Sequence, residues 1–220
     1  DKCGFGIYEF SVNSASSVEG KIVYEKLDDV TAEDFIYANG EYVVLGQDYS
    51  QKSNSFDKSS FIFIDGVKYT ETAKKSIDSY LLNAMESSSD GTKAFASGSV
   101  INSKTGKDVA VFVQIDLKKR DLISEDGIYR FPSSDATKNS NFTYLAVNGN
   151  ELFLGGFIER DYIYDSSDYS SGYPYLVAYD IEKNRVRYKN CYNDALYKEY
   201  EIQSCTLSDL STPLIELYNA

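Results

Sequence analysis

The stretch Asn148-Gly149-Asn150-Glu151-Leu152-Phe153-Leu154-Gly155-Gly156 joins a turn dipeptide to a short apolar strand, with glycine where the strand ends. Two other stretches, 39–46 and 90–98, have the same order of residue types. After a polar loop, each is followed by a second apolar strand that ends in aspartate, at Asp65, Asp116 and Asp180. One such unit cannot bury its apolar face alone, so the copies are expected to stack on one another.

The repeat predicts an all-β domain. Its glycines, Gly46, Gly98 and Gly156, lie about 55 residues apart, and four units of that length fill the 220-residue chain. The Asn-Gly and Asp-Gly dipeptides favour tight antiparallel hairpins. Two segments, 73–85 and 193–203, could be helical instead. A β-sandwich would show the same strand alternation, but it would not naturally repeat glycine and then aspartate at this spacing.

The two ends of the chain each look like half of a unit. Segments 6–10 and 21–24 match the last two strands of a unit, and segments 202–207 and 213–218 match the first two. Such a division is the closure pattern of a β-propeller, in which the first and last segments share one blade. We therefore expect a single domain over residues 1–220. Its units are expected at about 30–72, 73–130 and 131–190, with a shared blade from 1–29 plus 191–220.

The unit resembles a propeller blade of the broad kelch-like and bacterial repeat-propeller kind. In such blades an apolar strand ends in glycine at the axis and a later strand ends in aspartate, as in Leu152-Phe153-Leu154-Gly155-Gly156 and Val177-Ala178-Tyr179-Asp180. The later tryptophan of kelch blades and the WD40 signatures are absent. The resemblance implies architecture only: a small β-propeller of about four blades whose N- and C-terminal strands share a blade, or an arc of a larger propeller.

Composition narrows the functional classes. The net charge of −12, from 34 acidic and 22 basic residues, argues against binding a nucleic-acid backbone, which needs clustered Lys and Arg. The chain has no histidine, so it cannot form a Ser-His-Asp triad, a Cys-His dyad or a histidine-bound zinc site by itself. No apolar run is long enough to span a membrane as a helix. These features favour a non-catalytic protein.

The chain has three cysteines, Cys3, Cys191 and Cys205, and no CxxC pair. Cys191 and Cys205 lie in adjacent predicted strands and could form a disulfide bond. Cys3 could pair with Cys205 if the termini meet, and all three could also be reduced. A disulfide bond would favour a secreted, periplasmic or cell-surface location. The opening Asp1-Lys2-Cys3 suggests a processed form or part of a larger protein.

The loop at 158–174 is the longest departure from the repeat. Tyrosine offers a large flat contact face at low entropic cost, so we expect this loop to bind a protein or a glycan. Its candidate binding residues are Arg160, Asp161, Tyr162, Tyr164, Asp165, Asp168, Tyr169 and Tyr173. The three aspartates of this set have a spacing that suggests calcium, but they match no EF-hand loop and no cofactor is expected. The repeated Asp65, Asp116 and Asp180 are expected to cap turns.

The favoured interpretation is a non-catalytic binding or scaffold domain, outside the cytoplasm, within a larger protein or complex. One alternative is a carbohydrate-active enzyme that uses paired carboxylates, although the sequence cannot nominate the pair among 34 acidic residues. Another is a purely structural subunit whose strand edges or faces pack on neighbours.

Replacing Tyr162, Tyr164, Tyr169 and Tyr173 together with alanine should leave Tm nearly unchanged, because loop side chains add little to a core. The same variant should bind its partner more weakly, by about 2 kcal/mol if one of the tyrosines is a hot spot. Thermal unfolding and titration calorimetry check both parts. Loss of folding would show that these tyrosines belong to the core.

Overall fold

A computed structural model describes residues 3–14, 17–123, 128–130, 139–159, 172–191, 200–207 and 213–219 of the chain. Within these ranges every regular element is a β-strand, and every strand pair is antiparallel. The all-β fold class is therefore confirmed, and in the described ranges no helix is long and apolar enough to cross a membrane.

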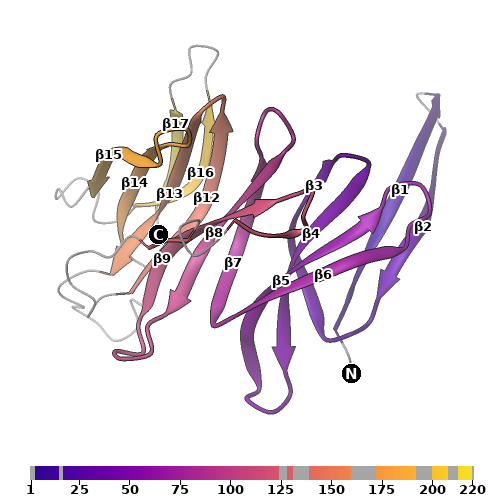
Figure 1. Cartoon of the computed structure of the whole chain (residues 1–220), viewed down its shortest axis with the longest axis horizontal. Helices are drawn as coiled ribbons and strands as arrows, with labels where there is room; N and C mark the ends of the chain where they lie inside the picture. The colour runs from indigo at the N-terminus through magenta and orange to yellow at the C-terminus, as the bar shows by residue number, and fades with distance from the viewer. Residues whose placement is uncertain are drawn as a thin grey trace.

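Three large sheets form the body of the molecule, each built from consecutive strands (Figure 1). The first sheet has the order β3 (Val30–Ala38), β4 (Glu41–Ser50), β5 (Ser55–Asp65) and β6 (Glu71–Asp78). The second contains β7 (Tyr80–Ser87), β8 (Lys93–Ile101) and β9 (Asp108–Asp116), with β10 (Asp121–Leu122) and β11 (Ile128–Arg130) both paired to β9. The third contains β12 (Ser140–Asn148), β13 (Glu151–Glu159), β14 (Gly172–Asp180) and β15 (Arg185–Cys191).

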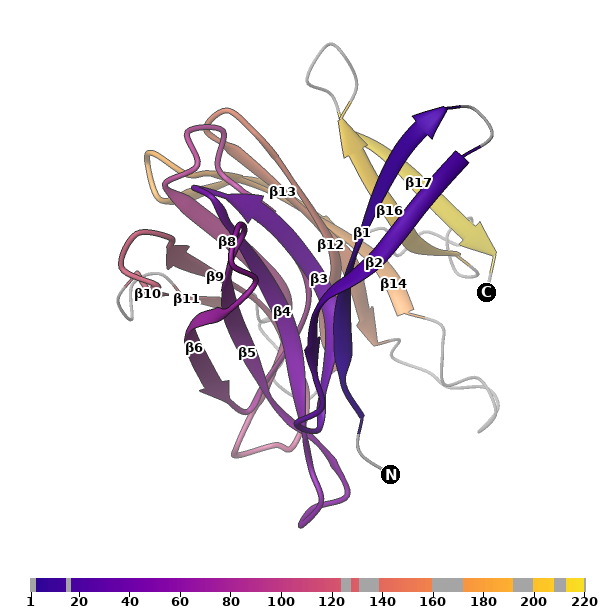
Figure 2. The ribbon, with the colours of Figure 1, turned by 90° about the vertical axis from the view of Figure 1, so that its right-hand side faces the viewer.

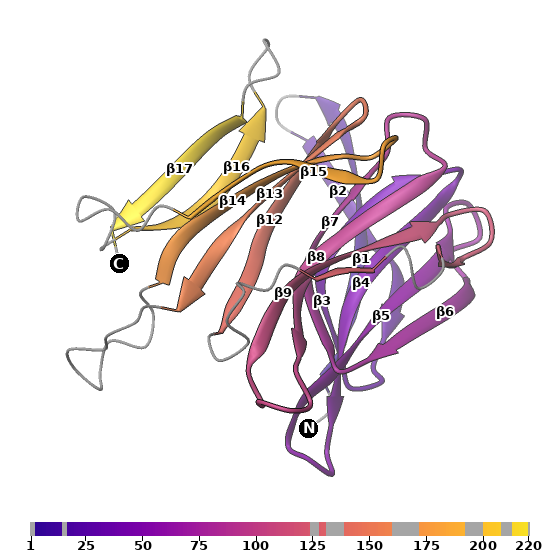
Figure 3. The same cartoon turned by 60° about the vertical axis from the view of Figure 1, so that its left-hand side comes forward.

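A two-stranded hairpin lies at each end of this series. The N-terminal hairpin is β1 (Phe5–Ser14) with β2 (Ser17–Lys26), and the C-terminal hairpin is β16 (Tyr200–Leu207) with β17 (Pro213–Asn219). The first strand of each sheet contacts the first strand of the next, so that β3, β7, β12 and β16 follow one another. The sheets thus succeed one another along the molecule as blades do (Figure 3).

The blades form an open arc. Among the described strand pairings none joins the N-terminal hairpin to the C-terminal hairpin, and the two lie on opposite sides of the molecule (Figure 1). They overlap in Figure 2 only because that view looks along the series of sheets. In the part of the chain that the structure describes, the two hairpins of the expected shared blade, 1–29 plus 191–220, are not paired with each other, which fits the arc among the two expected architectures.

Two segments show how turn chemistry and strand pairing decide local structure. Asp65 caps a turn after β5 through the N–H groups of Val67 and Lys68, at 2.9 and 2.7 Å, so that β6 does not follow β5 directly. Tyr69 then has a positive φ of 54°, and the strand begins at Glu71. The helical alternative for 73–85 is wrong, because this segment forms β6 and β7. Pairing with neighbouring strands outweighs local helix propensity.

The repeated glycines lie inside strands, not at strand ends. Gly46, Gly98 and Gly156 each face a β-bulge in the first strand of their sheet. A Cβ atom on Gly98 or Gly156 would overlap a main-chain carbonyl group across the bulge, and one on Gly46 would lie 2.9 Å from the carbonyl oxygen of Thr31. The close approach of two backbones at the bulge therefore explains why the glycine recurs. β16 carries the same bulge, after Ile202.

The core lies between the sheets. The second and third strands of each sheet are apolar on both faces, and one cluster fills the space between the first and second sheets: Val43, Leu45, Phe61, Phe63, Leu82, Met85, Val111 and Val113. A second cluster, with Phe112, Phe142 and Tyr179, lies between the second and third sheets. Buried serines link the sheets: Ser59 Oγ donates to Tyr80 O and accepts from Leu82 N, at 2.9 and 2.8 Å. Burial on two faces makes each sheet depend on its neighbours.

Gly98→Ala should destabilise the protein by about 1–3 kcal/mol, because its Cβ would collide with a carbonyl group that the sheet cannot move easily. Ser97→Ala is the matched control. Ser97 is fully buried in the same strand and its Oγ has no hydrogen-bond partner, so its removal should cost little. Urea unfolding of both variants makes the comparison. Equal midpoints would contradict the close-approach explanation.

Candidate functional site

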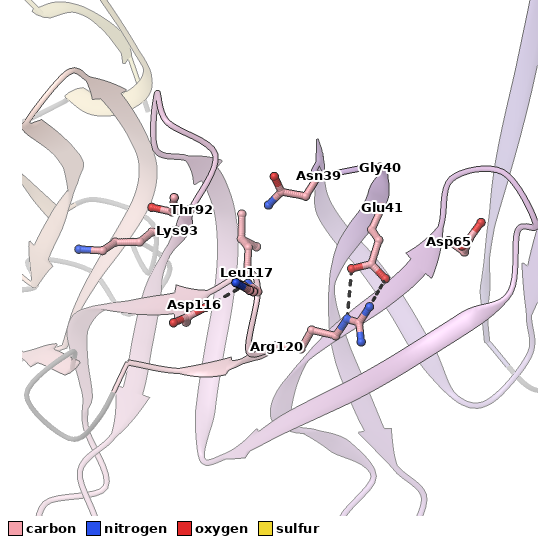
Figure 4. A pocket seen from close by; sticks show the side chains of 10 residues that line it. Asn39, Gly40, Glu41, Asp65, Thr92, Lys93, Asp116, Leu117 and Arg120 are labelled. Atoms are coloured by element: carbon pink, nitrogen blue, oxygen red, sulfur yellow. Dashed lines mark hydrogen bonds and ion pairs between the residues drawn. The ribbon is translucent and has the colours of Figure 1, made fainter.

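Two pockets open at the same end of the arc, where the hairpin turns lie. One lies between the first and second sheets, has a volume of about 610 Å³, and is lined by Asn39, Gly40, Glu41, Asp65, Thr92, Lys93, Asp116, Leu117, Lys118 and Arg120 (Figure 4). The other, of about 440 Å³, lies between the second and third sheets and is lined by Ser88, Ser89, Asp90, Lys93, Gly149, Asn150, Ile181 and Glu182. The pockets recur because the repeat places similar turns at each junction.

The polar groups of the larger pocket mainly hold the two sheets together. The Arg120 guanidinium donates to both carboxylate oxygens of Glu41, at 3.1 and 2.9 Å (Figure 4). Thr72 Oγ1 donates to the same carboxylate at 2.7 Å. Asn39 Nδ2 donates to the carbonyl oxygen of Gly91 at 2.7 Å, which joins the turns of neighbouring sheets. These contacts give the pocket a structural role that explains its charges.

The three repeated aspartates cap turns, as the sequence predicts. Asp116 accepts hydrogen bonds from the N–H groups of Lys118 and Lys119, and Asp180 accepts one from Lys183, as Asp65 does in its own turn. In each case the backbone N–H donors are the main cause that holds the carboxyl pKa below its usual value. The carboxylates at these turns are therefore structural groups.

One pair of acidic residues lies on neighbouring first strands. Burial raises the pKa of Glu86 on β7, and the charge of Asp34 on β3 raises it further. Both oxygens of Asp34 already accept backbone hydrogen bonds, from Phe35 N at 2.8 Å and from Met85 N at 2.7 Å. Asp34 therefore bridges the first and second sheets at the bulge. No sequence pattern marks this pair, because it forms only when the two sheets pack.

An apolar surface covers the N-terminal side of the arc. Its members are large side chains that are half or more exposed: Tyr8, Phe10, Ile22, Leu27, Phe35 and Tyr37. We call this set the N-terminal apolar surface. It includes a groove of about 280 Å³ between β1 and β3, lined by Phe5, Gly6, Ile7, Tyr8, Ala32, Glu33, Asp34, Phe35 and Val44. Tyr8 and Phe35 of this set both line the groove, and exposed apolar side chains that gather in this way are typical of interaction sites.

Most of the sequence-predicted binding residues lie outside the described part of the chain, which omits 160–171. The loop is shorter than expected, because Ile158 and Tyr173 pair with each other in β13 and β14 and the pairing extends to Glu159 and Gly172. Cys3 is a free, half-buried thiol, so the structure does not contain the Cys3–Cys205 bond. Cys191 and Cys205 have described backbones in β15 and β16, and a bond between them stays a prediction.

Asp90 gives a pH-dependent test of the turns around the smaller pocket. Hydrogen bonds from Ser88 Oγ, Thr92 N and Thr92 Oγ1 lower the pKa of Asp90 from 3.8 to about 2. Its contribution to stability is therefore fully present above about pH 4 and is lost as the pH falls through 2. Asp90→Ala should flatten the pH dependence of Tm over this window, and Thr92→Val should flatten it less. Parallel Tm profiles for wild type and Asp90→Ala would contradict this assignment.

No protein-family model matches the sequence, and no curated protein matches it. The exo-β-1,3-galactanase of Phanerochaete chrysosporium aligns with 96% of this chain and 49% of its own, at 10% identity and a TM-score of 0.56. The β-propeller domain of Cps50 (Swd1) from Myceliophteria thermophila aligns with 96% of this chain and 62% of its own, at 7% identity and a TM-score of 0.51. The Dos1 propeller aligns with 88% of this chain and 46% of its own, at 8% identity and a TM-score of 0.50.

The chain thus spans about half of the length of the solved structures that it resembles. At these identities the similarity shows the fold alone. The resemblance to repeat propellers is confirmed as architecture, without a family or a repeat motif. The chain has the fold of a small or partial β-propeller.

Proposed function

We propose that the chain is a non-catalytic binding or scaffold domain that acts outside the cytoplasm. The observation that supports this proposal is the N-terminal apolar surface, where Tyr8, Phe10 and Ile22 are exposed on one hairpin and Phe35 and Tyr37 on the strand beside it. An apolar surface with an unpaired strand edge suits a protein partner, because a partner strand can add main-chain hydrogen bonds to the burial of side chains. A glycan would instead need polar groups aimed at its hydroxyls.

The tyrosine-rich segment at 160–171 is the second element of the proposal. We expect it to contact a protein or a glycan, because tyrosine offers a large flat contact face at low entropic cost. The larger turn-end pocket contributes less, since its Arg120 and Glu41 are used in a contact between sheets. The −12 net charge favours a partner other than nucleic acid.

A carbohydrate-active enzyme is the second candidate, and the Asp34–Glu86 pair is the observation that favours it. A glycosidase needs one carboxyl group with a raised pKa as general acid and a second one that stays ionised. Glu86 fits the first requirement, whereas the two backbone hydrogen bonds of Asp34 fit a structural group at least as well. Hydrolysis of a β-1,3-linked galactan oligosaccharide, abolished by Glu86→Gln, would favour this candidate over the binding domain.

Replacing Phe10 and Ile22 with serine should weaken binding of a protein partner at least about tenfold, because both side chains would be desolvated in the complex. Val67→Ser is the matched control, since Val67 is 81% exposed but lies in the turn between β5 and β6. Surface plasmon resonance against the partner captured by the wild-type chain gives the affinities, and circular dichroism confirms folding. Equal affinities for all three proteins would place the interaction elsewhere.

A further inference from the structure

The bulge–glycine register aligns the first strands of the three sheets residue by residue. Ala32, Leu82 and Phe142 each pair with the repeated glycine of their sheet. Three residues further along the chain, Phe35, Met85 and Leu145 therefore occupy one equivalent position. Corresponding positions of a repeat should have corresponding surroundings, so any difference in burial shows where a neighbour is missing.

The first sheet differs from the other two at this position. Met85 and Leu145 are 5% and 9% exposed, whereas Phe35 is 63% exposed. β3 and β4 of the first sheet cover Met85, and strands of the second sheet cover Leu145 in the same way. The N-terminal hairpin packs instead on β4 and β5, through Phe5 and Ile7. Phe35 thus occupies a position that is buried in the other two sheets, but no preceding sheet buries it.

The groove beside Phe35 lies where the first and second strands of a preceding sheet would lie. β1 pairs with β2 on one edge, and its other edge has no partner among the described strands. The groove lies between that edge and β3, and residues of both line it. In a complete sheet of this repeat, the second strand pairs with the third and the first strand covers the next sheet. The N-terminal hairpin therefore supplies the third and fourth strands of a sheet whose first and second strands are absent.

The C-terminal hairpin corresponds to the two strands of the repeat that the N-terminal hairpin lacks. β16 contacts β12, β13 and β14, as β7 contacts β3, β4 and β5, and it has the bulge of a first strand. β17 is then a second strand, and its only described partner is β16. In one molecule this hairpin lies on the opposite side from β1 and β2 (Figures 1 and 3). In the strand order of the repeat, β17 as a second strand has the position that pairs with a third strand such as β1.

We propose that a second copy of this chain places its C-terminal hairpin in the groove, with its β17 along β1 and its β16 over Phe35. The contact converts two half-sheets into one four-stranded sheet and removes two exposed strand edges. Two such contacts, related by a twofold axis, close the pair into a ring. This inference rests on the proposed binding function and names its partner as the chain itself.

Light scattering coupled to size exclusion tests the proposal with the purified chain at about 50 µM, a concentration at which a micromolar dimer would persist. The expected mass is twice the 24.7 kDa of one chain. Phe35→Glu should reduce the dimer affinity at least about tenfold, and Tm of the monomer should not change because Phe35 is exposed. The matched control Val67→Glu adds the same charge at an exposed apolar residue outside the groove and should remain dimeric.

Hydrogen exchange identifies the surface used. The amides of 5–11 in β1 should be protected in the wild-type dimer and exchange faster in Phe35→Glu, while those of 109–113 in β9 stay unchanged. A wild-type monomer, or a dimer that Phe35→Glu leaves intact, overturns the proposal. If the chain is monomeric but still binds another protein through Phe10 and Ile22, this inference fails and the proposed function stands. A wild-type chain that neither dimerises nor binds another protein overturns both this inference and the proposed function.

Discussion

Burial of both faces of each sheet is the constraint on which the rest of the structure depends. In β9, Val111 and Val113 pack toward the first sheet, while Ala110 and Phe112 pack toward the third. A strand with apolar side chains on both faces is stable only between two neighbours. The sheets must therefore form a series, and a series has two ends unless it closes. At each open end of the series, one sheet face lacks a neighbouring sheet.

Directional contacts fix how neighbouring sheets meet, because apolar burial alone has no preferred register. Ser59 on β5 joins the first sheet to β7, and at the next junction Ser140 on β12 accepts a hydrogen bond from the N–H of Ala110 on β9. Asp34 and the Arg120–Glu41 pair add further links between the first two sheets. Polar residues that look functional in the sequence are thus used to align the sheets.

The surface left for function is the one that the repeat does not cover. In the larger turn-end pocket, Arg120 and Glu41 bond to each other, and Asp65 and Asp116 cap turns, so most of its acidic groups have structural partners. The large apolar side chains of the N-terminal apolar surface stay half or more exposed, although Tyr8 contacts Phe10 and Tyr37 contacts Tyr42, and residues of these types are buried elsewhere in the repeat. A scaffold built from stacked sheets therefore offers its strongest binding surface at the point where stacking stops.

The sequence by itself determined the elements that depend on local chemistry. The Asn39-Gly40 turn has positive φ at both residues, and Asp65, Asp116 and Asp180 cap their turns, because these choices need only the adjacent backbone. The repeat length and the all-β class followed from the same spacing. The sequence did not reveal why the glycines recur, since the bulge that each one faces belongs to another strand.

Only the tertiary structure decided that the arc stays open, that Asp34 lies beside Glu86, and that Phe35 is exposed while Met85 is buried. Each of these depends on the angle between sheets, which is the sum of many packing contacts between residues far apart in the chain. Phe35 and Met85 look alike in the sequence as apolar residues of a first strand. They differ because a preceding sheet covers one and not the other, and this difference is a property of the assembly of sheets.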